Sequence, residues 1–413
     1  MPVLGAALQK GLSIVASEDR PLLTHRSGVS TIAGRKVGPE TALTAAAVYS
    51  ATSLLAQTVA ELPIDFVRRE DTERRPRQPE GLRAFWARPN PYQTRIAFYE
   101  TLVLSMLIHG NFYGYPRRNT RGDILEVWPL DPQRITEVES VENEDGTAWT
   151  RFWLDGFTNE EGTSWLHNIP GRPPEIIHIP WMTAPGRVKG MSPVEFHAEL
   201  IGMSLSAQEH AARFLGEGTH KSGVIEHPNP LTPEEAKQVW DGWQMQHSGP
   251  KKAGSIAVLT AGSKFNPITI PPNELQFLEQ MKFTDRKIAS LYRVPPHMIG
   301  DTERSTSWGT GIAEQTQGFL TYTLLPILRR IEEAVEALPN ATGLQMKFNV
   351  NGLMRGVAKD RGEFYNRMWN LGAMNQDEIR AFEDMPPIPN GQGQRYLVPL
   401  NMRPIDEEVS DED

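Results

Sequence analysis

Cysteine is absent from all 413 residues of the chain. Its absence excludes disulfide bonds, thiol catalysis and metal sites with cysteine ligands, so non-covalent packing alone has to hold the fold together. The chain also lacks an apolar run of the roughly 18–20 residues that a membrane span needs, so no membrane partner is expected. Its first residues have neither the basic start nor the long apolar stretch of a secretory signal and are interpreted as part of the mature protein.

Basic residues are also fewer than acidic residues. Lys and Arg total 42 against 51 Asp and Glu, a formal net charge of −9. This balance argues against a protein that binds nucleic acid over one large basic surface. Residues 401–413 hold six acids and one arginine, a charge of −5, so the remaining body carries −9 − (−5) = −4. A local basic site is therefore compatible with the composition.

The familiar signatures of enzymes are missing too. There is no GxxxxGK[ST] phosphate loop, no GxGxxG after a strand, no HExxH and no GxSxG. The ten histidines are dispersed: His197 and His210 share one predicted helix but are too far apart for a helical metal pair, and His178 lies in an apolar strand, as a core histidine would. The sequence predicts no catalytic residue, no metal site and no cofactor.

What is present is the pattern of an α+β protein, with a length that suggests two or three domains. Residues 1–41 look irregular and are expected to form a flexible or partner-docked arm. Helical periodicity follows at 41–62 and 94–109, the latter stopped by Gly110. Short β-rich runs fill most of the remainder up to about residue 182, at 64–69, 112–118, 124–130, 134–140, 150–155 and 175–180. Together they predict an α+β domain over 42–190.

Two long helices are predicted next, over 191–217 and 272–293, and they flank a compact α/β insert at 218–271. The insert reads as a strand at 223–227, a helix at 232–246, and strands at 255–260 and 265–270. A third helix is predicted at about 310–337, and Pro326 should kink or interrupt it because proline has no N–H and clashes with the preceding turn. A strand at 344–350 and a helical tail at 356–384 precede the Pro-rich, acidic end at 385–413, which is expected to be loose.

The surfaces of the two long helices carry opposite charge. On the second, Lys282, Arg286 and Arg293 fall within about 40° of one another, so they face either solvent and acidic partners or nucleic-acid phosphates. The first carries an acidic face, formed with Arg213 by Glu195, Glu199, Glu209 and Glu217. Its apolar stripe is predicted to comprise Phe196, Leu200, Met203, Ala207, Ala211 and Phe214. The acidic rod of one subunit could pair with the basic rod of its neighbour in a ring, or the same residues could pack within the chain.

Several short motifs, in this order and spacing, resemble the portal proteins of tailed bacteriophages, of the shorter siphophage type. The resemblance covers about residues 42–385. Its most specific motif is Arg293-Val294-Pro295-Pro296-His297-Met298-Ile299-Gly300. The others are Leu62-Pro63, Pro89-Asn90-Pro91 with Gln93-Thr94, Gly110-Asn111-Phe112-Tyr113, Gly190-Met191-Ser192-Pro193, Leu324-Leu325-Pro326-Ile327-Leu328 and Ile331-Glu332.

The resemblance implies a division into named parts. These are a wing at 42–190, completed by a kinked tunnel helix and strand at 310–355, two stem helices at 191–217 and 272–293, a clip at 218–271, a tunnel loop at 294–309 and a short helical crown at 356–384. Protomers of the family assemble as a ring, typically of twelve subunits, at one capsid vertex of the virion. The charge pattern of the helices offers Lys282, Arg286 and Arg293 as candidates to face DNA in the channel, and the tunnel loop adds Asp301, Glu303, Arg304 and Ser305. The same pattern offers Glu195, Glu199, Glu209, Arg213 and Glu217 for contacts between stems.

The resemblance also implies partners and a location. The partners are further copies of the chain, double-stranded DNA bound without sequence preference, the large terminase that drives packaging, a head-completion or neck adaptor protein and the major capsid protein. Assembly would take place in the host cytoplasm. Two alternatives remain open at this point: a capsid-associated hydrolase, either a maturation protease or a nuclease, and a monomeric adaptor module.

Overall fold

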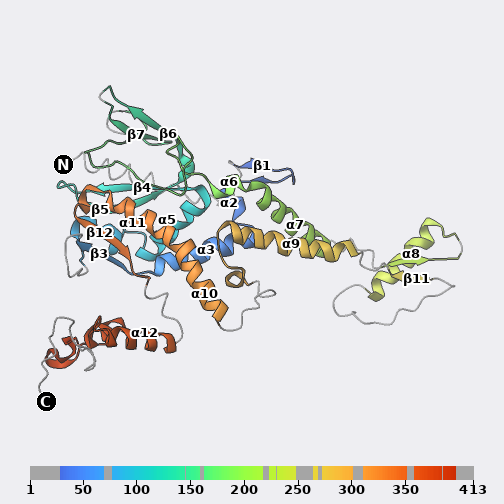
Figure 1. Cartoon of the computed structure of the whole chain (residues 1–413). Coiled ribbons are helices and arrows are strands. Elements are labelled where there is room, and N and C mark those ends of the chain that lie inside the picture. The colour runs from blue at the N-terminus through green and yellow to red at the C-terminus, as the bar shows by residue number, and fades with distance from the viewer. Residues whose placement is uncertain are drawn as a thin grey trace, which may run out of the picture.

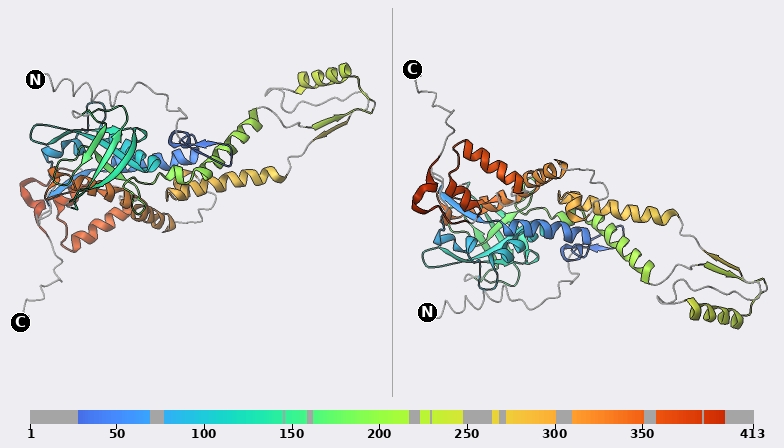
Figure 2. Two further views of the ribbon diagram at one scale, coloured as in Figure 1. Left: turned by 90° about the horizontal axis from the view of Figure 1, so that it is seen from above. Right: turned by 90° about the horizontal axis from the view of Figure 1, so that it is seen from below.

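The computed structural model describes residues 28–68, 77–144, 146–158, 162–216, 223–228, 230–247, 264–267, 272–300, 310–350, 358–383 and 385–396. Helices and strands are mixed along the chain, which confirms the α+β class. A body of packed helices and sheets carries a stem of two helices, and a small module lies beyond the end of the stem (Figures 1 and 2).

Two helices form the centre of the body, and both lie within the predicted ranges 41–62 and 94–109, although the first begins at Ala46 and not at Thr41. These are α3 (Ala46–Glu61) and α5 (Arg95–His109), which pack against each other. Thr94 begins α5 because its hydroxyl accepts a hydrogen bond from the N–H of Ala97 at 3.2 Å, and Gly110 ends it in a left-handed conformation with φ of 72°. In the sequence, the short helix α2 (Pro39–Ala42) precedes α3, and the short helix α4 (Arg83–Trp86) precedes α5.

Three antiparallel sheets belong to the body. The first has the order β5–β4–β9 and is formed by β5 (Ile124–Leu130), β4 (Asn111–Arg118) and β9 (Ile177–Pro180). The second has the order β6–β7–β8 and is formed by β6 (Ile135–Glu142), β7 (Ala148–Leu154) and β8 (Trp165–Asn168). The third pairs β3 (Ile64–Arg68) with β12 (Leu344–Phe348) and so joins distant parts of the chain. Of these strands only β8 was not predicted.

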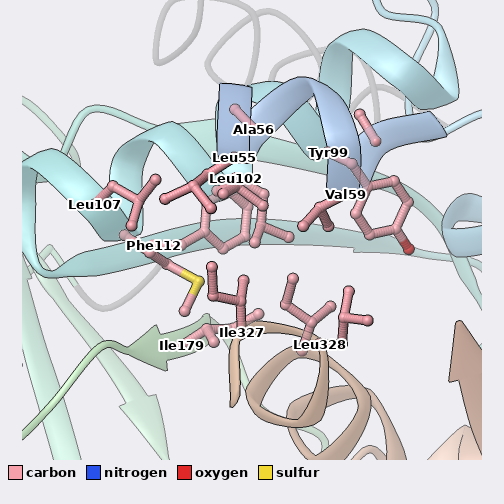
Figure 3. Packing of buried hydrophobic residues seen from close by; sticks show 14 of the residues in the cluster. Leu55, Ala56, Val59, Tyr99, Leu102, Leu107, Phe112, Ile179, Ile327 and Leu328 are labelled. Atoms are coloured by element: carbon pink, nitrogen blue, oxygen red, sulfur yellow. The ribbon is translucent and has the colours of Figure 1, made fainter. Parts of the chain in front are cut away.

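The core of the body lies where α3, α5, β4 and β9 meet the helix α11 (Leu325–Glu336) (Figure 3). Leu55 and Val59 of α3 are completely buried, as their helical spacing predicted. From the other side Ile327 and Leu328 of α11 close the same core. Burial of apolar area is the main source of stability here, and it joins the predicted wing to the segment after residue 310.

The third long helix is interrupted, as Pro326 predicted. It comprises α10 (Thr310–Phe319), a π-helical segment (Leu320–Leu324) and α11. Pro326 lies in the first turn of α11, directly after the π-helical segment, where the hydrogen-bond pattern changes. Farther along α11, the buried carboxylate of Glu332 accepts hydrogen bonds from the N–H of Phe348 (2.9 Å) and the ammonium of Lys347 (3.2 Å), which ties the helix to β12.

The structure corrects three predictions, which concern the N-terminal arm, the first long helix and the C-terminal tail. Of the arm predicted over 1–41, residues 1–27 lie outside the described residues, and the rest is not irregular: β1 (Val29–Ser30) and β2 (Lys36–Val37) form a hairpin that is followed by α2. The helix predicted over 191–217 is broken at His197 into α6 (Pro193–Phe196) and α7 (Ala198–Gly216). It breaks because α6 packs against α5 and α2 in the body, whereas α7 packs against a different helix in the stem.

The third correction concerns the start of the C-terminal tail. After α12 (Ala358–Asn370) and α13 (Gln376–Phe382), residues 385–396 are docked and not loose. The N–H of Ile388 donates to Asp377 Oδ1 at 2.7 Å, and the hydroxyl of Tyr396 donates to Glu378 Oε1 at 2.8 Å. The acidic end at 397–413 lies outside the described residues.

Candidate functional site: the stem and its junction with the body

The stem consists of α7 and the antiparallel helix α9 (Pro272–Leu291), both of which the sequence predicted as rods. Ile201 of α7 and Ile288 of α9 are completely buried. A polar contact joins the two helices: the hydroxyl of Ser204 donates to Asp285 Oδ1 at 3.2 Å. Burial raises the pKa of Asp285, and this hydrogen bond partly offsets the effect. The two rods therefore act as one unit, and Figure 2 shows them leaving the body together.

At the base of the stem, two of the sequence motifs meet. Gly110 and Asn111, which end α5 and begin β4, lie against Gly190 and Met191, which lead into α6. The approach is so close that a Cβ on Gly110 would lie 2.2 Å from the carbonyl oxygen of Met191, and one on Gly190 would lie 2.1 Å from that of Gly110. Ser192 completes the contact by donating its hydroxyl to the carbonyl of Ile108 at 2.8 Å. The two glycines are thus required because backbone touches backbone here.

Asn111 is the polar centre of this junction and is 1% exposed. Its amide nitrogen donates to the carbonyls of Gly190 (2.9 Å) and His109 (3.1 Å). Its amide oxygen accepts from the N–H of Gly190 at 2.7 Å and lies 2.9 Å from Nε2 of His178. Because two carbonyls fix the amide nitrogen, the oxygen must face His178, and the imidazole therefore carries its proton on Nε2.

Two histidines at the junction are held neutral. Burial lowers the pKa of His178 to about 3, and Lys189 acts in the same direction. The ring of His178 also stacks on Tyr113 at 4.8 Å, as expected for the core histidine that the sequence predicted. Burial likewise lowers the pKa of His109 to about 4, although Asp131 opposes the shift.

These two histidines should make the protein sensitive to acid. An unfolded chain binds protons at histidines near pH 6.5, whereas the folded protein resists them until about pH 3–4. The free energy of unfolding should therefore fall as the pH drops below about 6.5, by up to about 1.4 kcal/mol per pH unit for each histidine. Urea unfolding at pH 7 and pH 5 tests this. His178→Gln should flatten the dependence, whereas the same change at exposed His197 should not; equal slopes in all three proteins would contradict the assignment.

Two of the acids predicted for contacts between subunits, Glu199 and Glu209, bind groups of their own chain. The carboxylate of Glu199 accepts the N–H of Ile32 at 3.1 Å to each oxygen, and Glu209 forms an ion pair with Arg35. Both contacts hold the β1–β2 hairpin against α7, where Gly202 leaves room for Thr31. Glu195 is exposed, and the side chain of Arg213 and all of Glu217 lie outside the described residues.

The apolar stripe predicted for the first long helix is wrong at two positions. Phe196, at the end of α6, is 65% exposed and Met203 of α7 is 44% exposed, whereas Ala198 and Ile201 are buried. The side chain of Phe214 lies outside the described residues. The face of α7 that packs inward is thus rotated from the most hydrophobic face, because the partner helix α9 and the hairpin occupy the neighbouring sides. The rotation leaves large apolar side chains on the surface of the stem.

The end of α9 separates Arg293 from Lys282 and Arg286, the other two cations on the predicted DNA-facing line. Lys282 is exposed and Arg286 half-buried, both on the helix. Arg293 does not continue their line, because α9 ends at Leu291 and Arg293 adopts φ of 55°, in the left-handed region. There its carbonyl accepts the hydroxyl of Thr323 at 2.8 Å, which anchors the end of the stem to the π-helical segment. Asp301, Glu303, Arg304 and Ser305 of the predicted tunnel loop lie outside the described residues.

The insert between the stem helices contains the elements that its sequence predicted, as far as they are described. β10 (Gly223–Glu226) pairs antiparallel with β11 (Lys264–Pro267), and α8 (Pro233–His247) lies between them in the chain. The strand predicted at 255–260 lies outside the described residues. Figure 1 shows these elements beyond the end of the stem that is remote from the body.

Two other kinds of site are not found among the described residues. Within this part of the chain, no group of three or more His, Asp or Glu side chains is placed to hold a metal ion. Among the same residues, no helix combines the length and the apolarity needed to cross a bilayer.

The N-terminal hairpin is the feature of the site that the sequence did not reveal. Its strands are only two residues long each, too short for an alternating pattern. Its turn, Ile32 to Arg35, includes Gly34 with φ of 76°, a weak signal by itself. The exposed cations and acids around it gave no indication that Glu199 and Glu209 would be bound from within the chain.

Comparisons with known proteins agree on one family. The family model described as phage portal protein matches residues 46–384. A probable portal protein of Streptomyces phage phiC31 is 34% identical, over 93% of this chain and 84% of its own, and the portal protein of Enterobacteria phage HK97 is 27% identical, over 86% and 82%. Among solved structures, the neck of an empty gene transfer agent particle superposes with a TM-score of 0.62 at 24% identity, covering 84% of this chain and 92% of the other.

The match spans the body, the stem, the insert and the helical tail in their observed order. It includes the junction motifs at Gly110 and Gly190 and the Arg293–Gly300 motif on which the resemblance in the sequence rested. The chain belongs to the phage portal protein family.

Proposed function

We propose that the protein closes into a ring at one capsid vertex of a phage particle and that double-stranded DNA passes through its axial hole during packaging and ejection. The observation that carries the proposal is the two-helix stem, which holds an α/β module away from the body in a chain of the portal family. A gene transfer agent neck described with C12 symmetry contains a chain of similar fold, with a TM-score of 0.60 at 22% identity over 92% of this chain.

The parts of the chain are assigned as follows. Residues 42–190 and 310–355 form the wing, which faces the major capsid protein. The stem comprises 191–217 and 272–293, and the insert at 218–271 is the clip, where the large terminase and later a neck adaptor dock. We assign residues 294–309 to the tunnel loop and 356–384 to the short crown, with 1–41 as the N-terminal arm and 385–413 as the acidic tail. Assembly takes place in the host cytoplasm.

The charge of the chain suits a conduit that guides DNA without holding it. Each phosphate that a protein neutralises releases counterions and adds affinity, so a continuous basic bore would retain the polymer. The net charge of −9 disfavours such a bore. Lys282 and Arg286 on α9 are our candidates for weak guiding contacts, together with Arg293 near its end and the mixed charges of the tunnel loop.

Electron microscopy of the purified protein tests the proposal directly. Annular particles with a central hole wide enough for duplex DNA are expected. A compact monomer under all assembly conditions, including co-expression with capsid protein, would refute it. A monomer that cut DNA in the presence of divalent cations would favour a nuclease, but the family match supports a portal and not that alternative.

Reversing charge on α9 should impair the ring or its retention of DNA. The double change Lys282→Glu and Arg286→Glu places two acids where we expect DNA phosphate or an acidic stem, so ring yield or packaged DNA should fall several-fold. The matched control is Arg121→Glu, a reversal on an exposed turn of the body. Ring yield by sedimentation and DNA content of particles are the measurements. If the double variant and the control behave alike, these cations have no special role.

A further inference from the structure

A groove of about 250 Å³ opens on the stem between α7, α9 and the N-terminal hairpin. Its walls are the side chains of Ala33, Met203, Ser206, Ala207, His210, Gln280, Met281 and Thr284. Small-molecule sites are usually about 300–1,000 Å³ and deeply enclosed, so this groove is on the small side for one. It suits a single large side chain, and its apolar wall of Met203, Ala207 and Met281 suits an apolar one.

An exposed aromatic side chain projects from another face of the same stem. Phe283 of α9 is 54% exposed, and the ammonium of Lys287 lies 4.5 Å from its ring centroid. At 100° per residue, Phe283 points about 160° from Met281, 100° from Thr284 and 60° from Gln280, the three α9 residues that line the groove, so it points to the side of the groove and not into it. A large ring left this exposed is a common anchor of protein interfaces.

The charges around the two features are complementary. Exposed Lys287 lies against the ring of Phe283, whereas exposed Glu199 lies one helical turn from Met203 at the groove. Phe283 and the groove lie on different sides of the stem, so copies can match them head to tail, each copy offering Phe283 to one neighbour and its groove to another. A head-to-tail contact of this kind is the one that generates rings.

We propose that Phe283 of one protomer inserts into this groove of the next protomer. The inference rests on the proposed ring and adds the contact that joins neighbouring stems. The hairpin then has a role in assembly: Glu199 and Glu209 hold it against α7, and its Ala33 forms one wall of the groove.

Removing the ring of Phe283 tests the anchor. Phe283→Ala should weaken association at least tenfold and so lower the fraction of rings at a fixed protein concentration, because truncated interface anchors have effects of this size. Thermal unfolding should change little, since the side chain is exposed in the protomer. Ala207→Trp, which fills the groove, should have the same effect on assembly. Phe364→Ala is the matched control, because Phe364 is 46% exposed on α12 and lies outside the stem.

Cross-linking tests the geometry independently of these losses. Since the chain has no cysteine, Lys287→Cys and Ala207→Cys each introduce a single thiol, and neither removes Phe283. Mixed and treated with a short bismaleimide, the two proteins should yield a 287–207 link between protomers in preference to 287–287 or 207–207 links. Links between like positions, or full ring yield from Phe283→Ala, would overturn the contact while leaving the ring intact. Wild-type protein that never forms rings would instead remove the proposed function.

Discussion

Replacing Gly110 by alanine is expected to lower the free energy of unfolding by about 3–4 kcal/mol, a large effect for one methyl group. Gly110 has φ of 72°, a conformation that costs an L-residue about 1–2 kcal/mol. In addition, the new Cβ would lie 2.2 Å from the carbonyl oxygen of Met191, so β4 and the segment leading into α6 would have to separate. Chemical denaturation gives the stability, and the yield of rings should fall with it, because this junction sets the position of the stem.

Alanine substitutions at two other glycines measure the conformational part and the steric part of this loss separately. Gly122 has φ of 87°, and a Cβ added there would meet nothing within 4 Å, so Gly122→Ala should cost only the conformational part, about 1 kcal/mol. Gly190 lacks a positive φ, but its Cβ would lie 2.1 Å from the carbonyl oxygen of Gly110, so Gly190→Ala should cost the steric part alone. If alanine at 110 were no worse than at 122, the backbone contact would not be a determinant of stability.

The elements that the sequence predicted well are those whose signals are local. The helices α3 and α5 have helical apolar spacing and clear ends at Pro63 and Gly110, and both ends formed as expected, although α3 begins five residues after the predicted start. Pro326 predicted an interruption because the chemistry of proline acts within a single turn. The family motifs also identified important places, since Gly110-Asn111 and Gly190-Met191 proved to be the two sides of one contact.

What the sequence could not predict depends on partners distant along the chain. A helical wheel finds the most hydrophobic face of α7, but it cannot tell that α9 and a hairpin occupy other sides and leave Met203 exposed. The same limit applies to Glu199, which looks like a free surface acid until Ile32 is placed beside it. Arg293 left the line of Lys282 and Arg286 because α9 ends two residues earlier. The N–H groups of Arg293 and Val294 close the helix end by donating to the carbonyls of Ser290 and Ala289, with Arg293 in the left-handed conformation.

Replacing Asn111 by leucine should destabilise the junction by about 3 kcal/mol. Leucine has a similar shape but can neither donate to the carbonyl of Gly190 nor accept its N–H, so both backbone groups would be buried without partners. Nε2–H of His178 would lose its acceptor as well. Each buried polar group left unpaired costs about 1–3 kcal/mol, and some relaxation of the junction should keep the total below the sum. Urea unfolding at pH 7 measures the loss.

Asn111→Asp distinguishes lost hydrogen bonding from a changed charge. An aspartate can still accept from Gly190 and His178, but it cannot donate to the carbonyls of Gly190 and His109, so stability at pH 7 should also fall. Its negative charge beside His178 should raise the pKa of that imidazole from about 3 towards its ordinary value. The folded state would then bind a proton at higher pH, and less stability would be lost between pH 7 and pH 5 than in the wild type. Leucine at 111 supplies no such charge, so if both variants kept the wild-type acid response, Asn111 would not control the protonation of His178.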